Sequence, residues 1–119
     1  MSEQKRRTYD QGIMGEGAAE IFLRAKGFKI LARRYKSSVG EIDLIALDDP
    51  YLVFVEVKAR QSVEDALHAI TPKMRSRIHE AAGHFIAANP AYADFPMRVD
   101  VMAVQLPFKI QHLENAFME

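Results

Sequence analysis

The stretch that decides the fold is GEIDLIALDDPYLVFVEVKAR, which runs from Gly40 to Arg60. Its apolar runs, residues 41–47 and 52–60, predict two strands, and the Asp48-Asp49-Pro50 turn between them predicts a hairpin. Charged residues interrupt both strands: Glu41, Asp43, Glu56 and Lys58. Strand interiors disfavour such residues, and burying an unpaired charge is costly, so a function must be sought for these four positions.

Side chains alternate between the two faces of a strand. In residues 52–58, one face carries Val53, Val55 and Val57, and the other carries Phe54, Glu56 and Lys58. In residues 41–47, one face carries Ile42, Leu44 and Ala46, and the other carries Glu41, Asp43, Ile45 and Leu47. A register that places Asp43 beside Glu56 would bring two carboxylates and an ammonium group together. Adjacent carboxylates repel each other, and a bound Mg²⁺ or Mn²⁺ ion would relieve that repulsion.

Two helices are predicted on either side of this hairpin. Residues 11–27 form the first, with Asp10 as its N-cap, Gly27 as its C-terminal stop, and a core stripe of Met14, Ala18, Ile21, Phe22 and Ala25. Thr71 caps the second, which has Pro72 at its first position and extends to about residue 89. Its core stripe is Met74, Ile78, Ala81, Ala82, Phe85 and Ile86.

The remaining segments complete an αβββαβ order. Residues 28–35 and 97–106 predict two further strands, and residues 61–71 predict a loop. The tail, residues 109–119, either adds a short strand or packs against the domain. We therefore expect an α/β fold with a mixed four-stranded sheet flanked by helices, and a right-handed crossover between its parallel strands.

Length and composition fit one domain over residues 1–119, with a core at about 12–106 and a flexible N-terminus at about 1–9. The chain has no cysteine, which excludes a disulfide scaffold, a thiolate zinc site and a cysteine nucleophile. The sequence has neither a secretory signal pattern nor an apolar run long enough to span a bilayer. We therefore expect a cytoplasmic protein that does not associate with a membrane.

The net charge is zero, but the charges are unevenly distributed. Residues 1–77 hold 14 of the 16 basic residues and 11 of the 16 acidic ones. Such asymmetry is typical either of an anionic partner or of ordinary solvated surface charge. The candidate nucleic-acid-binding residues are Arg33, Arg34, Lys36, Arg60, Lys73, Arg75 and Arg77.

Four blocks of the chain resemble known families. GEIDLI followed by FVEVKAR resembles the PD-(D/E)xK signature of the restriction-endonuclease-like nuclease superfamily. Together with GxxGExxAxxFLxxKGF at residues 12–28 and TPKMRSRI at residues 71–78, these blocks resemble the YraN-like family of small bacterial proteins. The resemblance covers about residues 12–104 and implies the restriction-endonuclease-like αβββαβ core. One departure is Ile42, which stands where the signature has proline.

The resemblance also implies roles for individual residues. Asp43 and Glu56 would bind Mg²⁺ or Mn²⁺, and Lys58 would orient or activate the attacking water and stabilise developing negative charge. Glu16 would match the extra acid of relatives similar to archaeal Holliday-junction resolvases, and it would bind the metal directly or through water. The catalytic candidates are thus Glu16, Asp43, Glu56 and Lys58.

Other interpretations stay open for the same residues. Glu41 can be an exposed acid at a strand end, and Asp43 and Glu56 can be half-buried acids paired with Lys58 or Arg60. Lys73, Arg75 and Arg77 can form a solvated helix face or contact phosphate near a helix N-terminus. The histidines of HEAAGH, residues 79–84, are five positions apart and do not share the helix face that a zinc-protease motif requires.

Two functions follow from this sequence. The first is a metal-dependent endonuclease that hydrolyses phosphodiester bonds of DNA, including branched or structured DNA, and acts as a homodimer on junctions. The second is a catalytically inactive module that uses the same fold to bind nucleic acid or a protein. An enzyme acting on a small molecule is disfavoured because the sequence has no cofactor signature.

Overall fold

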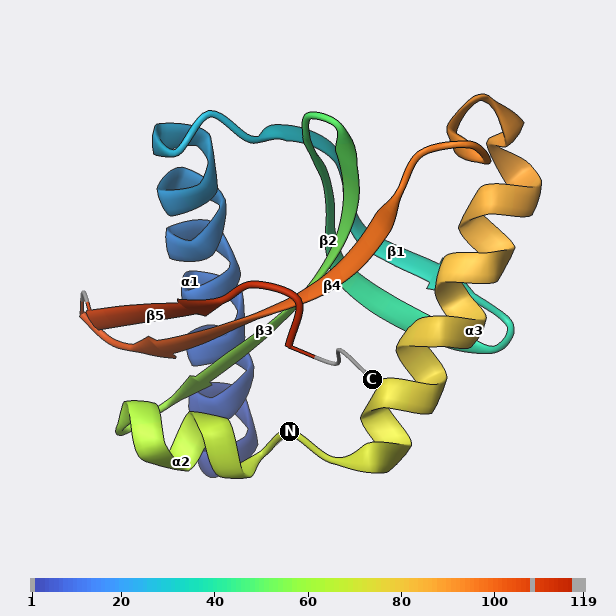
Figure 1. Ribbon diagram of the computed structural model, residues 1–119. Coiled ribbons are helices and arrows are strands. Elements are labelled where there is room, and N and C mark those ends of the chain that lie inside the picture. The colour runs from blue at the N-terminus through green and yellow to red at the C-terminus, as the bar shows by residue number, and fades with distance from the viewer. Residues whose placement is uncertain (1, 108, 117–119) are drawn as a thin grey trace.

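The computed structural model of the protein describes residues 2–107 and 109–116, except for the side chains of residues 7–10. The elements follow in the order α1 (Glu3–Ala25), β1 (Lys29–Ser37), β2 (Gly40–Asp48), β3 (Tyr51–Arg60), α2 (Val63–His68), α3 (Pro72–Ala88), a 3₁₀ turn (Pro90–Tyr92), β4 (Met97–Gln105) and β5 (Lys109–Leu113). The result is an α/β fold in which two long helices flank a mixed sheet (Figure 1).

The sheet has five strands in the order β1-β2-β3-β4-β5. The β1–β2, β2–β3 and β4–β5 pairs are antiparallel, and β3 and β4 are parallel. The connection between the two parallel strands contains α2 and α3, as expected for a crossover, since parallel neighbours need a long connection. The predicted number of four strands is wrong, because residues 109–113 of the tail pair with β4 and extend the sheet.

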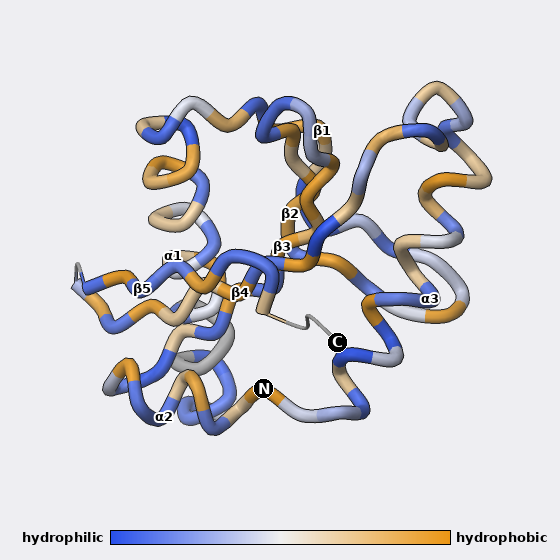
Figure 2. Tube along the Cα trace, viewed as in Figure 1, coloured by the Kyte–Doolittle hydropathy of each residue, from blue (hydrophilic) through white to orange (hydrophobic). Residues whose placement is uncertain are grey.

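Each face of the sheet is covered by one long helix (Figure 1). On one face, Ala19 and Leu23 of α1 pack against Val53, Val55 and Val57 of β3. On the other, Ile78 and Phe85 of α3 pack against Phe54 and its neighbours. The central strands are accordingly mostly apolar, whereas both helices alternate between polar and apolar residues (Figure 2). The predicted α3 stripe is confirmed: its members are buried or pack against this second core.

Helix α1 differs from the prediction in its start and in its buried face. It begins at Glu3, with the Ser2 side chain as N-cap in place of Asp10, so it covers most of the segment predicted to be flexible. Met14 and Ile21 are exposed, and the buried stripe consists of Gly15, Ala19 and Leu23. Gly27, with φ of 94°, directly follows the C-cap, as predicted for a C-terminal stop.

Close packing of α1 on the sheet explains which face is buried. A methyl group added at Gly15 would lie only 2.7 Å from the Cβ atom of Ala59 in β3. The helix therefore approaches the strand through its smallest residues, and the larger Met14 and Ile21 remain outside the contact. Apolar periodicity included those larger residues and so predicted only part of the buried face: Phe22 packs against the core, whereas Met14 and Ile21 do not.

Two smaller differences complete the fold. The predicted loop at residues 61–71 contains the short helix α2, which Ser62 caps through its side chain. The strands predicted from residues 28, 41 and 52 begin within one residue of those positions, and α3 ends at Ala88. Among the described residues, no helix is long and apolar enough to cross a membrane.

Candidate active site

The site forms where β2 and β3 separate. Their backbone pairing runs from Asp48–Tyr51 to Leu44–Val55. The next pair in this register would be Asp43 with Glu56, the register that the sequence left as a condition, but the ladder ends before it. Instead the Asp43 carboxylate accepts a hydrogen bond of 2.7 Å from the backbone N–H of Val57. A side chain thus takes the place of a backbone partner, and the carboxylate is held in the gap between the strands.

An irregularity in β1 lies opposite Asp43. Arg33 pairs with Leu44, and Tyr35 pairs with Ile42, so Arg34 stands opposite Asp43 with a positive φ of 49°. The alternation of faces breaks here, because Leu44 belongs to the α1 core and Ile42 to the α3 core. The prediction that Ile42 shares a face with Leu44 is therefore wrong, because the alternation of faces is lost at Asp43, opposite the positive φ of Arg34.

Helix α1 adds the third acid. Because Gly15 lets α1 approach β3 closely, Glu16 lies at the same hollow as the strand residues. This space, which we call the carboxylate hollow, has a volume of about 390 Å³. Its lining includes Gly12, Glu16, Arg34, Asp43, Glu56 and Lys58. All four candidate catalytic residues are thus brought together from α1, β2 and β3.

Asp43 is the acid whose charged form is disfavoured by its surroundings. Burial raises its pKa, as do the negative charges of Glu56 and Glu16, while the Val57 hydrogen bond and the Lys58 charge act in the opposite direction. The resulting pKa of Asp43 is about 8. At neutral pH, the metal-free protein therefore keeps this carboxyl group largely protonated.

The other two acids are paired with basic side chains of the same chain. Glu56 lies 3.0 Å from the Lys58 ammonium group, and Glu16 lies 3.0 Å from the Arg34 guanidinium group. The ion-pair alternative considered for Glu56 thus describes one real contact. Glu41 is exposed, in agreement with its alternative interpretation as an exposed acid at a strand end, although it also lines the hollow.

The donor set fits a hard divalent cation. Within the part of the chain that the structure describes, no group of three or more acidic or histidine side chains is arranged to hold a metal ion. Mg²⁺, however, is commonly bound by one or two carboxylates and several waters. Asp43 and Glu56 are adjacent oxygen donors, and burial together with the negative charge of Glu56 raises the pKa of Asp43, an effect that a bound cation would oppose. These two residues would hold the ion, with Glu16 beside them.

A larger groove continues from the carboxylate hollow toward α3. This α3 groove has a volume of about 700 Å³, and it shares Lys36, Glu41, Glu56 and Lys58 with the hollow. Its far side includes Lys73 and Arg77 from the first turns of α3. The β1–β2 turn closes onto this helix: a methyl group added at Gly40 would lie 3.0 Å from the carbonyl oxygen of Arg77.

The predicted nucleic-acid-binding residues are therefore divided. Lys36, Lys73 and Arg77 line the α3 groove, and Arg34 lines the carboxylate hollow. The others lie elsewhere: Arg33 binds Glu20, Arg60 donates to the carbonyl of Ala59 beside another hollow, and Arg75 is half-buried on α3. Gly12, one helical turn before Glu16, also lines the hollow and was not among the predicted site residues.

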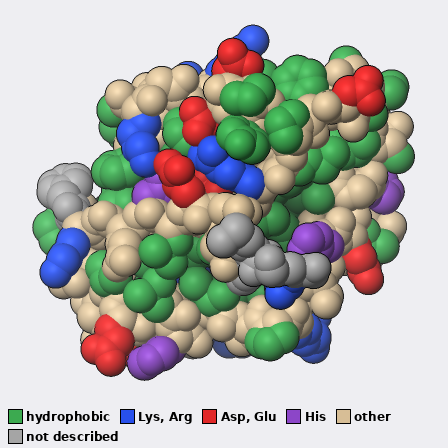
Figure 3. All heavy atoms as spheres, in the orientation of Figure 1, with side chains coloured by type: hydrophobic (Ala, Val, Ile, Leu, Met, Phe, Trp, Pro, Cys, Tyr) green, Lys and Arg blue, Asp and Glu red, His purple; other side chains and the backbone are tan. Residues whose placement is uncertain are grey.

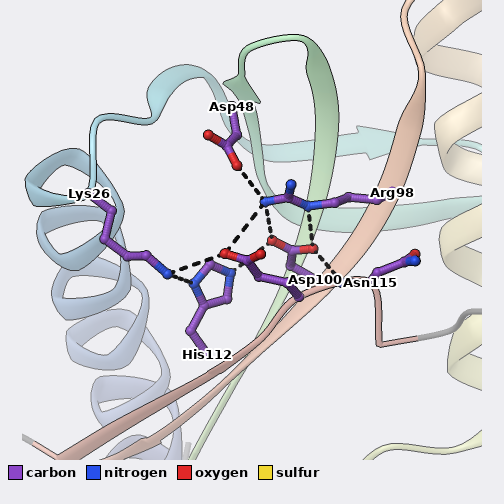
Figure 4. Close-up of polar contacts among 7 residues, drawn as sticks. Lys26, Asp48, Arg98, Asp100, His112 and Asn115 are labelled. Atoms are coloured by element: carbon purple, nitrogen blue, oxygen red, sulfur yellow. Dashed lines mark hydrogen bonds and ion pairs between the residues drawn. The ribbon is translucent and has the colours of Figure 1, made fainter.

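A second charged cluster lies toward the C-terminal end of α1, and the sequence did not reveal it. We call it the Arg98–Asp100 network. Figure 4 shows Asp100 enclosed by Arg98, His112 and Asn115, with Asp48 and Lys26 at the edges. Figure 3 shows acidic and basic side chains adjacent to one another on this face, between α1 and β4.

Asp100 is fully buried, and several donors satisfy its carboxylate. It accepts hydrogen bonds from Arg98 Nε at 3.0 Å, the backbone N–H of Asn115 at 2.9 Å and His112 Nε2 at 2.8 Å. The Lys26 ammonium group, 2.7 Å from His112 Nδ1, can only donate, so Nδ1 accepts and Nε2 carries the proton toward Asp100. These contacts tie α1, β2, β4 and β5 together.

Comparison with known proteins identifies the family. The model of the "Uncharacterised protein family UPF0102" matches residues 15–104. A UPF0102 protein of Rhodopseudomonas palustris (strain BisB5) is 45% identical over 109 residues, covering 92% of this chain and 83% of the relative. One from Bradyrhizobium diazoefficiens is 40% identical over 116 residues, covering 98% and 87%. One from Nitrobacter winogradskyi is 41% identical over 109 residues, covering 92% of each.

The chain therefore belongs to the UPF0102 family. This confirms the predicted relationship to the YraN-like family. Membership of the nuclease superfamily stays a prediction.

Proposed function

We propose that the protein is a metal-dependent endonuclease that hydrolyses phosphodiester bonds of DNA on a restriction-endonuclease-like core. One observation carries the proposal: Glu16, Asp43, Glu56 and Lys58 meet at one hollow, although they come from three elements and span 43 positions of the chain. A cluster of acids in which one member, here Asp43, has a raised pKa is typical of a functional site rather than of a structural one.

Each of these side chains has a chemical role in the proposal. When bound, Mg²⁺ or Mn²⁺ would supply Lewis acidity at the phosphate and promote deprotonation of a water molecule. Asp43 and Glu56 hold the ion. Lys58 donates hydrogen bonds toward the attacking water and the phosphate oxygens, where negative charge develops. Its ammonium group contacts Glu56 at 3.0 Å, and Lys58 lines both the hollow and the α3 groove.

The α3 groove supplies the path for the nucleic acid. Lys36, Lys73 and Arg77 line it beside the carboxylate hollow, so a strand whose scissile phosphate lies at Asp43 would place neighbouring phosphates among these cations. Lys73 lies in the first turn of α3, where the helix dipole also favours anions. For a junction substrate, which presents two scissile strands, a homodimer with two such sites is part of the proposal.

A second function is favoured by a different observation. Glu16 and Glu56 are already paired with Arg34 and Lys58, so the chain neutralises these two acids by itself. Such self-compensation also suits a catalytically inactive module that keeps the groove and binds nucleic acid, or a protein, without cleaving it. The two functions share the binding surface and differ in whether the hollow takes up a metal ion.

A cleavage assay with matched variants separates them. Purified protein is incubated with labelled junction, flap, single-stranded and linear DNA in the presence of Mg²⁺ or Mn²⁺. We expect cleavage of at least one substrate, and a loss of at least about a hundredfold in Asp43→Asn, Glu56→Gln and Lys58→Ala. Asp49→Asn, which alters an exposed acid in the β2–β3 turn, is the control and should keep full activity.

The outcomes are distinct. Cleavage that survives Asp43→Asn would contradict the assigned site. Salt-sensitive binding without cleavage in either metal would favour the inactive module. Lys73→Ala and Arg77→Ala should weaken DNA binding in both cases, because the groove belongs to both proposals.

A further inference from the structure

Two parallel ion pairs connect strand β1 to helix α1. Arg34 Nη2 lies 3.0 Å from Glu16 Oε2, and Arg33 Nη2 lies 2.7 Å from Glu20 Oε2. The arginines are consecutive on the strand, and the glutamates are one helical turn apart. The pairs are alike in exposure, with arginine side chains 42% and 58% exposed and glutamate side chains 19% and 17% exposed. The second pair is therefore a natural control for the first.

The backbone is distorted where Arg34 reaches the helix. Consecutive residues of a regular strand point to opposite faces. The positive φ of 49° at Arg34 breaks this rule and lets both arginines contact α1. A non-glycine residue in this conformation is strained, and such strain is concentrated at functional sites. The fold therefore accepts a local cost at the position that brings a guanidinium group to Glu16.

The two glutamates differ in their surroundings. Glu20 is held by Arg33 and also by Arg24, whose Nε lies 3.0 Å from Glu20 Oε2, and it lies outside the carboxylate hollow. Glu16 lines that hollow, and its charge acts on Asp43. Arg34 lines the same hollow. The Arg34–Glu16 pair thus lies at the site where the proposed function requires a metal ion.

We propose that Arg34 is a built-in counter-ion of Glu16 in the metal-free protein. When the metal ion binds, Glu16 turns from Arg34 to the ion, and the guanidinium group released from Glu16 binds substrate phosphate. The inference rests on the proposed function. It accounts for the finding that no three acids among the described residues are arranged around one ion, because Glu16 is engaged elsewhere. After the exchange, Arg34 would still line the hollow, where its planar fork matches two phosphate oxygens.

Metal affinity measured by titration calorimetry with Mn²⁺ tests the exchange. Arg34→Asn removes the charge while keeping a residue that tolerates positive φ. Because metal binding no longer has to break an ion pair, we expect this variant to bind Mn²⁺ about three- to fivefold more tightly than the wild type. The matched control, Arg33→Gln, should bind Mn²⁺ with unchanged affinity.

A double-variant comparison separates exchange from general electrostatics. Removing any nearby positive charge can favour a cation, with or without Glu16. In a Glu16→Gln background there is no carboxylate to release, so Arg34→Asn should give no further gain. In the wild-type protein, the Nε–Hε NMR signal of Arg34 should shift on addition of Mg²⁺, while that of Arg33 should not.

Each result decides the matter. The counter-ion role would be overturned if Arg34→Asn and the wild type bound Mn²⁺ with equal affinity, or if the gain in affinity persisted in the Glu16→Gln background. The proposed function would stay intact in both cases, provided that Asp43→Asn abolishes Mn²⁺ binding. If the wild type shows no Mn²⁺ binding that depends on Asp43, the proposed metal site fails, and the counter-ion role fails with it.

Discussion

Two aspartates on the same sheet have pKa values that are shifted in opposite directions. Asp100 in β4 is fully buried, and although burial raises its pKa, hydrogen bonds from His112, Arg98 and Asn115 outweigh that effect and lower it. Asp43 in β2 is half-buried, and burial together with the negative charges of Glu56 and Glu16 raises its pKa to about 8. Burial raises the pKa of both carboxyl groups, so the hydrogen bonds and the neighbouring charges decide the direction of the net shift.

The comparison distinguishes a structural cluster from a functional one. The Arg98–Asp100 network is closed, because its acids and cations saturate one another and connect four elements of the fold. The carboxylate hollow is open and holds an acid whose charge the surroundings oppose. A buried charge that is fully bonded is expected to contribute to structure, whereas one that the fold fails to satisfy points to a missing ligand.

The largest expected effect is at the closed cluster. Asp100→Asn removes the charge that compensates the mostly buried Arg98, and we expect it to destabilise the protein by about 3 kcal/mol or more. Urea denaturation at pH 7 measures the change. Because the pKa of Asp100 is lowered in the folded state, the stability it contributes is present above its ordinary value of 3.8 and is lost as the pH falls through the folded pKa.

The same substitution at the open cluster should have the opposite sign. Asp43→Asn removes the repulsion from Glu56 and Glu16, and its amide oxygen can still accept the Val57 hydrogen bond. We expect a stabilisation on the order of 3 kcal/mol at pH 8 with EDTA present. A loss of stability at both aspartates would break the comparison.

The pH dependence of that second effect has a definite sign. Between about pH 4 and pH 8, the unfolded state ionises Asp43 while the folded state keeps it protonated, so the wild type loses stability as the pH rises. Below pH 4 the advantage of Asp43→Asn should disappear. Denaturation curves of both proteins at pH 3.5, 6 and 8 provide the check.

A smaller effect is expected where α1 packs against β3. Gly15→Ala places a methyl group 2.7 Å from the Cβ of Ala59, which forces the helix away and should cost about 2 kcal/mol. Gly17→Ala, two positions along the same helix with open space around it, should instead stabilise by up to about 1 kcal/mol. Thermal unfolding of the two variants compares them directly. Because Glu16 moves with the helix, Gly15→Ala should also weaken Mn²⁺ binding, and Gly17→Ala should not.

The smallest expected effect is a proton count. An acid with a pKa of about 8 must lose its proton to bind a metal ion, so Mn²⁺ binding at pH 7 should release nearly one proton. Calorimetry in two buffers with different ionisation enthalpies measures this release. The affinity should rise by up to about tenfold per pH unit until pH 8 and then level off. In Asp43→Asn, residual binding with the same proton release would show that another group is responsible.

Local patterns in the sequence predicted much of the fold and part of the site. The hairpin, the buried face of α3 and the adjacency of Glu56 and Lys58 all depend on periods of two or 3.6 residues that neighbouring positions carry. The placement of Asp43 beside Glu56 was a condition that the sequence left open, and the β2–β3 register, which ends at Leu44–Val55, brings the two residues to the same end of the hairpin. The buried face of α1 followed only in part, because the close contact with Ala59, 44 positions away, places Gly15 at the sheet and leaves Met14 and Ile21 exposed.

The sequence by itself determined which residue types are available: three acids and a lysine inside predicted elements, and a family that the comparisons confirm. Only the tertiary structure decided how the charges pair. Arg34 reaches Glu16 through a distorted strand, and Asp100 is bonded by residues from other parts of β4 and from beyond it. The physical reason is that electrostatic energies depend on distance and burial in space, and neither can be read from positions along a chain.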